Sequence, residues 1–178
     1  MKWISHSAIG GTSAAIVDPV LIPAAVLGAT APDWLEWVLS AGGVHITHRK
    51  ETHYLIVWLL FFAASIPLAG HGVALLWLSA FAWGGFTHIL TDALTVQGVP
   101  FSPNSRRRFH LFGGRLRTGS PQEFIIAGAI SAAFVLVAWQ LHKDRSADFI
   151  PYFYDWSGAY ERGILDAYEW KQNRWKFI

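Results

Sequence analysis

Residues 52–91, THYLIVWLLFFAASIPLAGHGVALLWLSAFAWGGFTHILT, decide the fold. These forty residues lie between Glu51 and Asp92 and include no Asp, Glu, Lys or Arg. A membrane-spanning helix needs about 20 apolar residues, so the stretch is long enough for two spans joined by a glycine-containing turn. The predicted spans are Tyr54–Ala69 and Val73–Thr91, with the turn at Gly70–Gly72.

Apolar residues dominate other parts of the chain as well. Phe124–Leu141 is a further uncharged stretch and predicts another span. Of the 178 residues, 53% are hydrophobic and 15% are charged, whereas an average soluble domain has about 25% charged residues. A soluble all-α protein that buries these helices in its core is the alternative, but their lengths favour a membrane protein.

The first apolar stretch, Trp3–Pro32, contains a single charge, Asp18, followed by Pro19 and Pro23. Each proline removes a backbone donor and clashes with the preceding turn. We therefore expect two short helices with a break, a broken or re-entrant element buried in protein; one kinked span is the alternative. The predicted fold class is all-α, a polytopic membrane helical bundle with three clear spans plus this broken stretch, in a membrane-embedded domain of residues 1–142.

The basic residues predict an orientation. The loop before the second apolar stretch carries Arg49 and Lys50, and the turn at Gly70–Gly72 carries no Lys or Arg. Five arginines precede the last span: Arg106, Arg107, Arg108, Arg115 and Arg117. Because cytoplasmic loops are enriched in Lys and Arg, we expect both basic loops on the cytoplasmic side of a multi-pass protein.

Ionisable side chains gather at one predicted membrane face. His53 precedes one span, His88 and Asp92 end the next, and Glu123 begins the last. A helix that enters the membrane and one that leaves it place these groups at the same face, and intramembrane ionisable groups are usually functional. His88 and Asp92 also share one side of their helix, because they are four residues apart.

This pattern suits a metal ion, because an imidazole nitrogen and a carboxylate oxygen at i and i+4 can reach one cation. A buried hydrogen-bonded pair is the alternative. If the N-terminal stretch folds back, His6 and Asp33 reach the same face. Cysteine is absent, and nitrogen and oxygen ligands without sulfur suit zinc, with manganese or iron as further candidates.

Four motifs together resemble the YdjM-like family of membrane-bound metal-dependent hydrolases. They are Gly28–Asp33, His48-Arg49-x-x-Thr52-His53, Gly85-x-x-His88-x-x-x-Asp92-x-x-Thr95-x-x-Gly98 and Arg117-Thr118-Gly119-Ser120-x-x-Glu123. The sequence departs from the family pattern at Leu35, where a second Asp is common, and at Tyr54, where Ser is common. The family is remotely similar to the zinc-dependent phospholipase C and fungal nuclease superfamily.

The resemblance implies a metal-dependent hydrolase in the bacterial inner (cytoplasmic) membrane, acting on a phosphoester such as a phospholipid at the cytoplasmic face. Six residues match the polar signature of the family and are the candidate metal ligands: His6, Asp33, His53, His88, Asp92 and Glu123. A free carboxylate, Asp33 or Glu36, could act as general base. Candidate substrate-binding residues are Arg106, Arg107, Arg117 and His110; for the arginine run, a topology signal beside anionic lipid head groups is the alternative.

Residues 143–178 form a predicted amphipathic tail rich in aromatic side chains. It could lie on the membrane surface, dock a protein partner or pack back onto its own domain. Membrane lipids are the expected partners, and no nucleic acid is expected. Both a monomer and an oligomer are compatible with the sequence. The alternative function is a non-enzymatic membrane subunit of a larger assembly, for example in secretion or transfer, with a structural metal or polar cluster.

Overall fold

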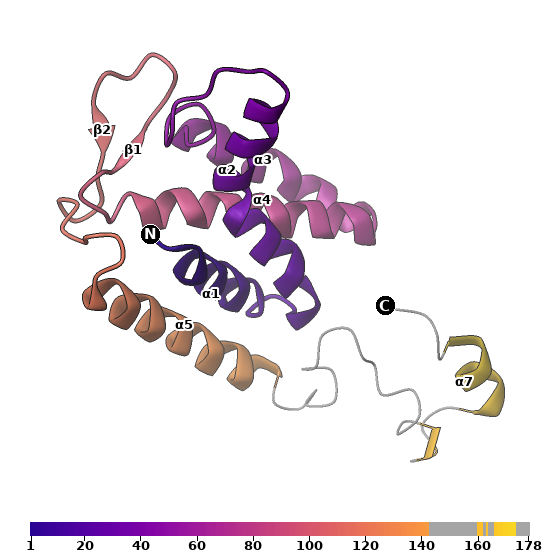
Figure 1. The fold of residues 1–178 in the computed structure, drawn as a ribbon. Coiled ribbons are helices and arrows are strands. Elements are labelled where there is room, and N and C mark those ends of the chain that lie inside the picture. The colour runs from indigo at the N-terminus through magenta and orange to yellow at the C-terminus, as the bar shows by residue number, and fades with distance from the viewer. Residues whose placement is uncertain (143–159, 162, 164–165, 174–178) are drawn as a thin grey trace.

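The structure, a computed structural model, describes residues 1–142, 160, 161, 163 and 166–173 (Figure 1). The described part of the chain is mostly helical, which confirms the helical part of the predicted class. Its elements are α1 (Trp3–Ala14), the 3₁₀ helix η1 (Pro19–Leu21), α2 (Ile22–Ala41), α3 (Leu55–Ser65), the 3₁₀ helix η2 (Ile66–His71), α4 (Val73–Asp92), β1 (Val99–Pro100), β2 (Arg108–Phe109), α5 (Pro121–His142) and α7 (Ala167–Asn173).

The N-terminal stretch breaks where its prolines predict. Asp18 caps η1, because its carboxylate accepts a hydrogen bond of 2.9 Å from the backbone nitrogen of Val20. Pro19 and Pro23 lie in the first turns of η1 and α2, where the missing donor costs no helical hydrogen bond. Helix α2 then packs against α1. It is longer than expected, because it continues through Pro32 to Ala41.

Helices α2 and α4 make the tightest crossing of the bundle, and two glycines permit it. A Cβ atom on Gly28 would lie 1.9 Å from the carbonyl oxygen of Phe81, and one on Gly84 would lie 2.0 Å from that of Ala25. No larger residue fits between the two backbones without moving them apart. This contact brings the middle of α2 alongside the C-terminal half of α4.

Among the described residues, two helices, α4 and α5, are long and apolar enough to cross a membrane. The predicted span over residues 54–69 is helical over Leu55–His71, but only part of it is α-helix. It consists of the 11-residue helix α3 followed by η2, whose first turn contains Pro67. A proline there removes a backbone donor, which accounts for the change from α to 3₁₀ geometry. The structure therefore supports two of the three predicted spans by length.

Helix α5 packs against α1 through Ile9 and Ala127. Most of its other apolar side chains point away from the protein. Ile125 is 69% exposed and Leu136 is 68% exposed. A helix of this length that buries so little of its apolar surface against protein requires another apolar environment, which a bilayer provides.

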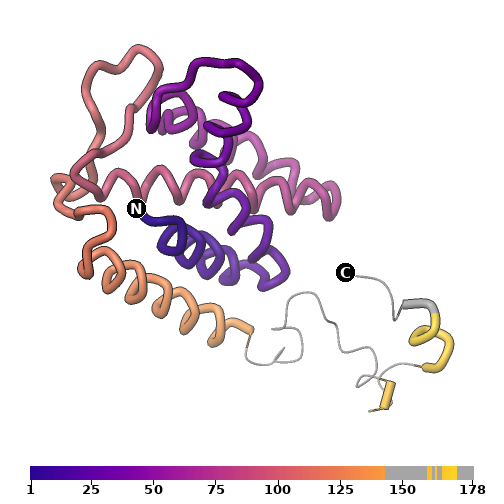
Figure 2. The backbone as a smooth tube through the Cα atoms, viewed as in Figure 1, coloured from indigo at the N-terminus to yellow at the C-terminus, as the bar shows by residue number. Residues whose placement is uncertain are grey.

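The polar end of the bundle is closed by the loop after α4. There β1 and β2 pair antiparallel, with Val99 opposite Phe109. Farther along the loop, the backbone nitrogen of Leu111 donates to the carbonyl of Ala93 at 2.8 Å. Figures 1 and 2 show the N-terminus, this hairpin and the start of α5 at the same end of the molecule. The all-α prediction omitted the hairpin, because strands of two residues show no alternating pattern.

Candidate metal centre

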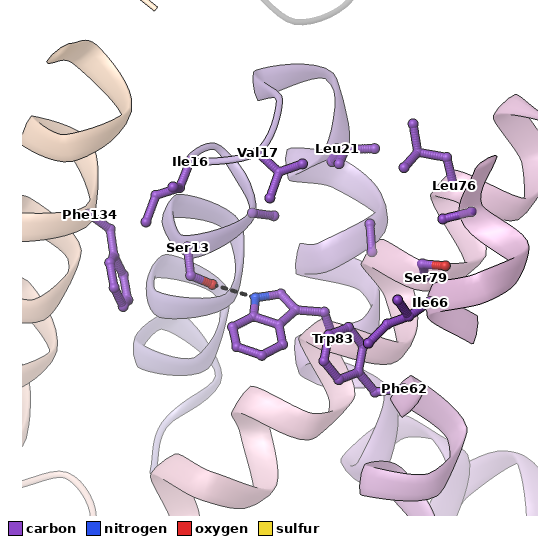
Figure 3. Close-up of a pocket in the computed structure, with 13 residues that line it drawn as sticks. Ser13, Ile16, Val17, Leu21, Phe62, Ile66, Leu76, Ser79, Trp83 and Phe134 are labelled. Carbon is purple, nitrogen blue, oxygen red and sulfur yellow. Dashed lines mark hydrogen bonds between the residues drawn. The ribbon is translucent and has the colours of Figure 1, made fainter. Parts of the chain in front are cut away.

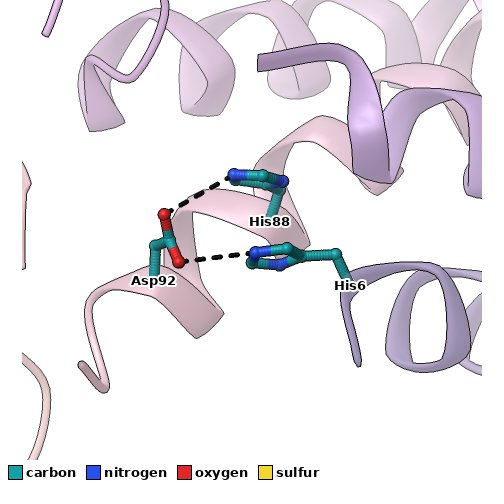
Figure 4. A group of neighbouring side chains, drawn as sticks. All are labelled: His6, His88 and Asp92. Atoms are coloured by element: carbon teal, nitrogen blue, oxygen red, sulfur yellow. Dashed lines mark ion pairs between the residues drawn. The ribbon is translucent and has the colours of Figure 1, made fainter. Parts of the chain in front are cut away.

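His88 and Asp92 lie one turn apart near the end of α4, and His6 reaches them from α1 (Figure 4). The Nε2 atom of His88 is 3.6 Å from Oδ2 of Asp92, and Nε2 of His6 is 3.4 Å from Oδ1 of the same carboxylate. The rings of His6 and His88 stack with centroids 3.7 Å apart. All three residues are buried. The break after α1 thus brings His6 to the predicted pair.

Asp33 and His53 complete the cluster from α2 and from the loop before α3. The Nε2 atom of His53 lies 3.4 Å from Oδ1 of Asp33 and 3.9 Å from Oδ2 of Asp92. The Nε2 atom of His88 lies 3.8 Å from the same Asp33 oxygen. Two overlapping groups could each hold a cation, with ligand atoms within 4.8 Å of one another: His6, His88 and Asp92, and Asp33, His53 and His88.

The opposite nitrogen of each imidazole is held by a protein partner. Nδ1 of His88 lies 2.7 Å from the carbonyl oxygen of Ala29, an acceptor, so this nitrogen carries the proton. Nδ1 of His6 lies 2.8 Å from Oγ1 of Thr91, whose hydroxyl hydrogen is directed to backbone carbonyls. These partners fix the tautomer that leaves Nε2 with a lone pair.

His53 follows the same rule. Its Nδ1 atom lies 3.3 Å from Oε1 of Glu36 and 2.9 Å from the hydroxyl of Thr52. The Thr52 hydroxyl donates a hydrogen bond to the same Glu36 oxygen. Burial would lower the pKa of His53, but hydrogen bonds to Asp33 and Glu36 and the charge of Asp92 outweigh it and raise the pKa above its ordinary value. Without a cation, these acidic neighbours therefore favour the protonated form of His53.

The atoms that face the centre of the cluster have no hydrogen-bond partner within the described part of the chain. They are the Nε2 atoms of His6, His53 and His88 and the Oδ2 atom of Asp92. Buried polar atoms are almost always paired, and leaving several unpaired together is costly. Divalent cations held by the two overlapping groups would satisfy these atoms, so the residues present fit such ions.

Glu36 is not the free carboxylate that the sequence suggested. Its oxygens accept hydrogen bonds from the backbone nitrogen of Arg49 at 2.8 Å and from Thr52 at 3.1 Å, and they face the rings of His48 and His53. With its lone pairs occupied, this carboxylate supports the histidine loop and is poorly placed to accept a proton from water.

Glu123 lies apart from the histidines. One of its oxygens accepts from the backbone nitrogen of Lys2 at 2.6 Å and from the hydroxyl of Ser5 at 2.8 Å. The other faces the backbone nitrogen of Gly119. The side chain therefore joins the start of α1 to the start of α5, and no group of candidate metal ligands among the described residues includes it. Asp92 also contacts the amino group of Met1.

The four predicted substrate-binding residues do not converge on the cluster. Arg106 and Arg107 are exposed in the hairpin loop, and Arg117 lines a surface hollow together with Arg115. The ring of His110 lies 3.2 Å from the carbonyl of Val96 and so supports the loop.

Arg49 is the basic residue that does reach the cluster. Its guanidinium lies 3.3 Å from Asp92 and is buried. From the sequence, Arg49 is a topology signal and part of the motif His48-Arg49-x-x-Thr52-His53, but it is not among the predicted site residues, although its place in that motif could have identified it.

A separate apolar cavity of about 570 Å³ lies farther along α1 and α4 (Figure 3). Trp83 crosses it and donates a hydrogen bond of 2.9 Å to Ser13. The wall includes Val17, Phe62 and Phe134. Trp83 precedes His88 by five residues, which corresponds to about 7.5 Å along the helix. An apolar cavity and a polar centre therefore occupy successive levels of the same two helices.

Most of the predicted aromatic tail lies outside the described residues. Within the part that is described, the rings of Tyr160 and Trp170 stack at 5.4 Å. The three uses proposed for this tail remain predictions.

Comparison with known proteins gives the family. No curated protein and no solved structure matches the chain. One family model, described as YdjM inner membrane protein, matches residues 1–150, and this range includes every residue of the candidate metal centre. Because the match covers most of the 178 residues, the chain belongs to the YdjM inner membrane protein family.

Proposed function

We propose that the chain is a membrane-bound hydrolase that uses a divalent metal, with zinc favoured by the chemistry of the ligands, to cleave a phosphoester. The observation that carries the proposal is the set of unpaired atoms at the cluster centre: Nε2 of His6, His53 and His88, with Oδ2 of Asp92. Three imidazoles and a carboxylate suit zinc, and manganese or iron can use the same donors. Structural pairing alone gives no reason for three lone pairs to converge.

The chain's own residues have distinct roles in this proposal. A divalent ion bound there would supply a Lewis acid and a water of lowered pKa. Within the two overlapping groups, His6, His53, His88 and Asp92 would hold metal, and Glu36, Thr91 and the Ala29 carbonyl would orient the rings. Asp33 keeps the most exposed side chain of the group, at 15%. We assign it to the open side, where its carboxylate would accept the proton of the attacking water.

The substrate class follows from what surrounds the centre. Helices α4 and α5 have the length and apolarity of membrane spans, so a substrate that resides in the membrane can reach the site. The apolar cavity beside Trp83 would receive a hydrocarbon chain while the polar end of the same molecule lay at the histidine cluster. These features support a phospholipid or a similar lipid phosphoester, cleaved at the cytoplasmic face that Arg49 and the later arginines predict.

The test measures metal and activity in the same samples. The wild-type chain, purified in detergent without chelator, should carry at least one transition metal ion per molecule and should hydrolyse bis(4-nitrophenyl) phosphate. His88→Ala and Asp92→Ala should lose both properties. His71→Ala is the matched control, because His71 is exposed at the end of η2 and has no part in the cluster; it should retain both.

A folded wild-type protein without metal would refute the proposal. A protein that keeps its metal but cleaves no phosphoester would instead favour the non-enzymatic membrane subunit with a structural ion.

A further inference from the structure

A small polar cavity of about 300 Å³ lies next to the candidate metal centre. It is lined by His48, Arg49, Gln97 and Arg108. The lining contains two guanidinium groups and no carboxylate, so its electrostatic character is positive. It is formed by two loops, one before α3 and one after α4, that the fold brings to the same end of the bundle.

Arg49 connects this cavity to the metal centre. Its side chain is about nine-tenths buried, with 9% exposure. One terminal nitrogen donates to the side-chain oxygen of Gln97 at 2.7 Å, and the other lies 3.3 Å from Oδ1 of Asp92. Its Nε atom has no hydrogen-bond partner among the described residues. A buried guanidinium with an unused donor is costly unless an acceptor arrives from outside the chain.

The backbone holds Arg49 in an uncommon conformation. Its φ angle is 56°, in the left-handed region that residues other than glycine rarely adopt. The backbone nitrogen is fixed by the carboxylate of Glu36, which also holds His53. Such strain persists where the surroundings over-determine it, and it is concentrated at ligand sites. The same carboxylate thus positions both a candidate metal ligand and the guanidinium beside it.

We propose that this cavity binds a phosphate group, with Arg49 as the anchor and Arg108 as a second contact from the hairpin. The planar guanidinium matches the oxygens of phosphate and can donate two parallel hydrogen bonds. Arg108 already reaches over the cavity, where its terminal nitrogen lies 3.2 Å from the carbonyl of Gly98. The inference rests on the proposed function in one respect: a phosphoryl group held here would lie one side chain, Asp92, away from the cation.

Phosphate binding can be measured directly on the full chain in detergent. Isothermal titration with inorganic phosphate should give saturable binding to the zinc-loaded wild type. Arg49→Gln should weaken that binding by roughly tenfold or more, because it removes a buried charged contact, while the zinc content stays unchanged. Lys50→Gln is the matched control: it is the next residue, is exposed and loses the same charge, and it should bind phosphate as the wild type does.

A second variant keeps the test decisive if Arg49→Gln fails to fold. Arg108 is exposed on β2, so Arg108→Gln should fold and still weaken phosphate binding. Equal phosphate affinity in the wild type and in the folded arginine variants would overturn the inference. If the wild type holds zinc but binds no phosphate, the inference fails and the metal proposal stands. If it holds no transition metal, the metal proposal fails, and phosphate titration of the metal-free chain still decides whether the cavity binds the anion.

The source of the phosphate is distinguished by competition. Nanodiscs that contain phosphatidic acid, which has a terminal phosphate, should displace inorganic phosphate if the cavity accepts a lipid head group, whereas phosphatidylcholine nanodiscs serve as the comparison. Displacement by phosphatidic acid alone identifies a lipid phosphate as ligand. Saturable binding of inorganic phosphate that neither lipid displaces supports the same site with a soluble ligand.

Discussion

The ring of His6 lies flat against the ring of His88, with the two planes 14° apart, although the residues come from α1 and α4. Two protonated imidazoles would repel each other in this arrangement, so the stack requires at least one neutral ring. Burial lets neither ring reach solvent freely. The pair is therefore suited to present two nitrogen lone pairs side by side to a cation.

Thr91→Val tests whether the hydroxyl behind His6 matters for metal binding. Valine has a similar shape but cannot accept the proton of Nδ1 of His6. We expect the affinity for zinc to fall by roughly 10- to 100-fold, as for other residues that orient metal ligands. A competitive chelator titration measures this change. Thr12→Val is the control, because the Thr12 hydroxyl donates only to backbone carbonyls within α1; comparable losses in both variants would contradict the orienting role.

Gly84→Ala tests the crossing of α2 and α4. The added methyl group would lie 2.7 Å from the backbone nitrogen of Ala29 and still closer to the Ala25 carbonyl. Moving the helices apart should lower the free energy of unfolding by about 1–3 kcal/mol and separate His88 from the Ala29 carbonyl, with loss of metal. Gly128→Ala on α5, where a methyl group meets nothing within 4 Å, should leave the melting temperature unchanged or raise it.

The response to pH follows from His53. In the metal-free protein its pKa is raised above the ordinary 6.5, so the protonated ring stabilises the fold below that value, and this contribution is lost as the pH rises through the raised pKa. Zinc requires the neutral ring. The difference in melting temperature between zinc-loaded and chelated protein should therefore widen from about pH 6 to about pH 8. A difference that narrows over this interval would contradict the assignment of His53 as a ligand.

The predicted orientation can be tested with single cysteines, because the chain has none of its own. Asn104→Cys in the hairpin loop should be shielded from a membrane-impermeant maleimide in intact cells and should react after permeabilisation. His71→Cys, in the turn without basic residues, should react in intact cells. Both positions are exposed on the protein. The reverse pattern would place the candidate metal centre on the outer side of the membrane.

The role of the apolar cavity can be tested by filling it. Ala69 lines the cavity at η2, and Ala69→Trp should slow hydrolysis of a long-chain phospholipid while cleavage of bis(4-nitrophenyl) phosphate is retained. Ala64→Trp places the same side chain at an exposed position of α3 outside the cavity and should affect neither substrate. Equal loss with both substrates in Ala69→Trp would indicate a damaged fold and would remove the support for a hydrocarbon chain.

Sequence reasoning reached the polar end of the bundle because periodicity and span direction are local properties. The i, i+4 spacing placed His88 and Asp92 together, and the prolines after Asp18 predicted a break, beyond which a stretch that folds back would bring His6 to them. The same reasoning specifies the depth of a residue along the membrane normal, but not its lateral position among the helices. Glu123 therefore seemed to belong to the cluster, whereas its lone pairs are taken by Lys2, Ser5 and Gly119.

The loops were harder to predict for a related reason. Counting arginines gives the charge of a loop but not its path through the protein. The burial of Arg49 was therefore not foreseen, and the exposed Arg106 and Arg107 were favoured as substrate-binding residues. The change from α to 3₁₀ geometry within the span predicted over residues 54–69 was not foreseen either. Hydropathy over residues 54–69 is uniformly high, and it cannot distinguish an α-helix from the 3₁₀ geometry that begins at Ile66.

The partners of the three histidines connect different parts of the chain in sequence. His6 of α1 is held by Thr91 of α4, His88 of α4 by Ala29 of α2, and His53 of the following loop by Glu36 of α2. Each ring thus joins two segments of the chain. Replacing the histidines with alanine would remove the contacts between three helices and a loop as well as the candidate metal ligands. A protein of this fold that lost the chemistry would therefore still need these side chains for stability, and this requirement would slow their replacement during evolution.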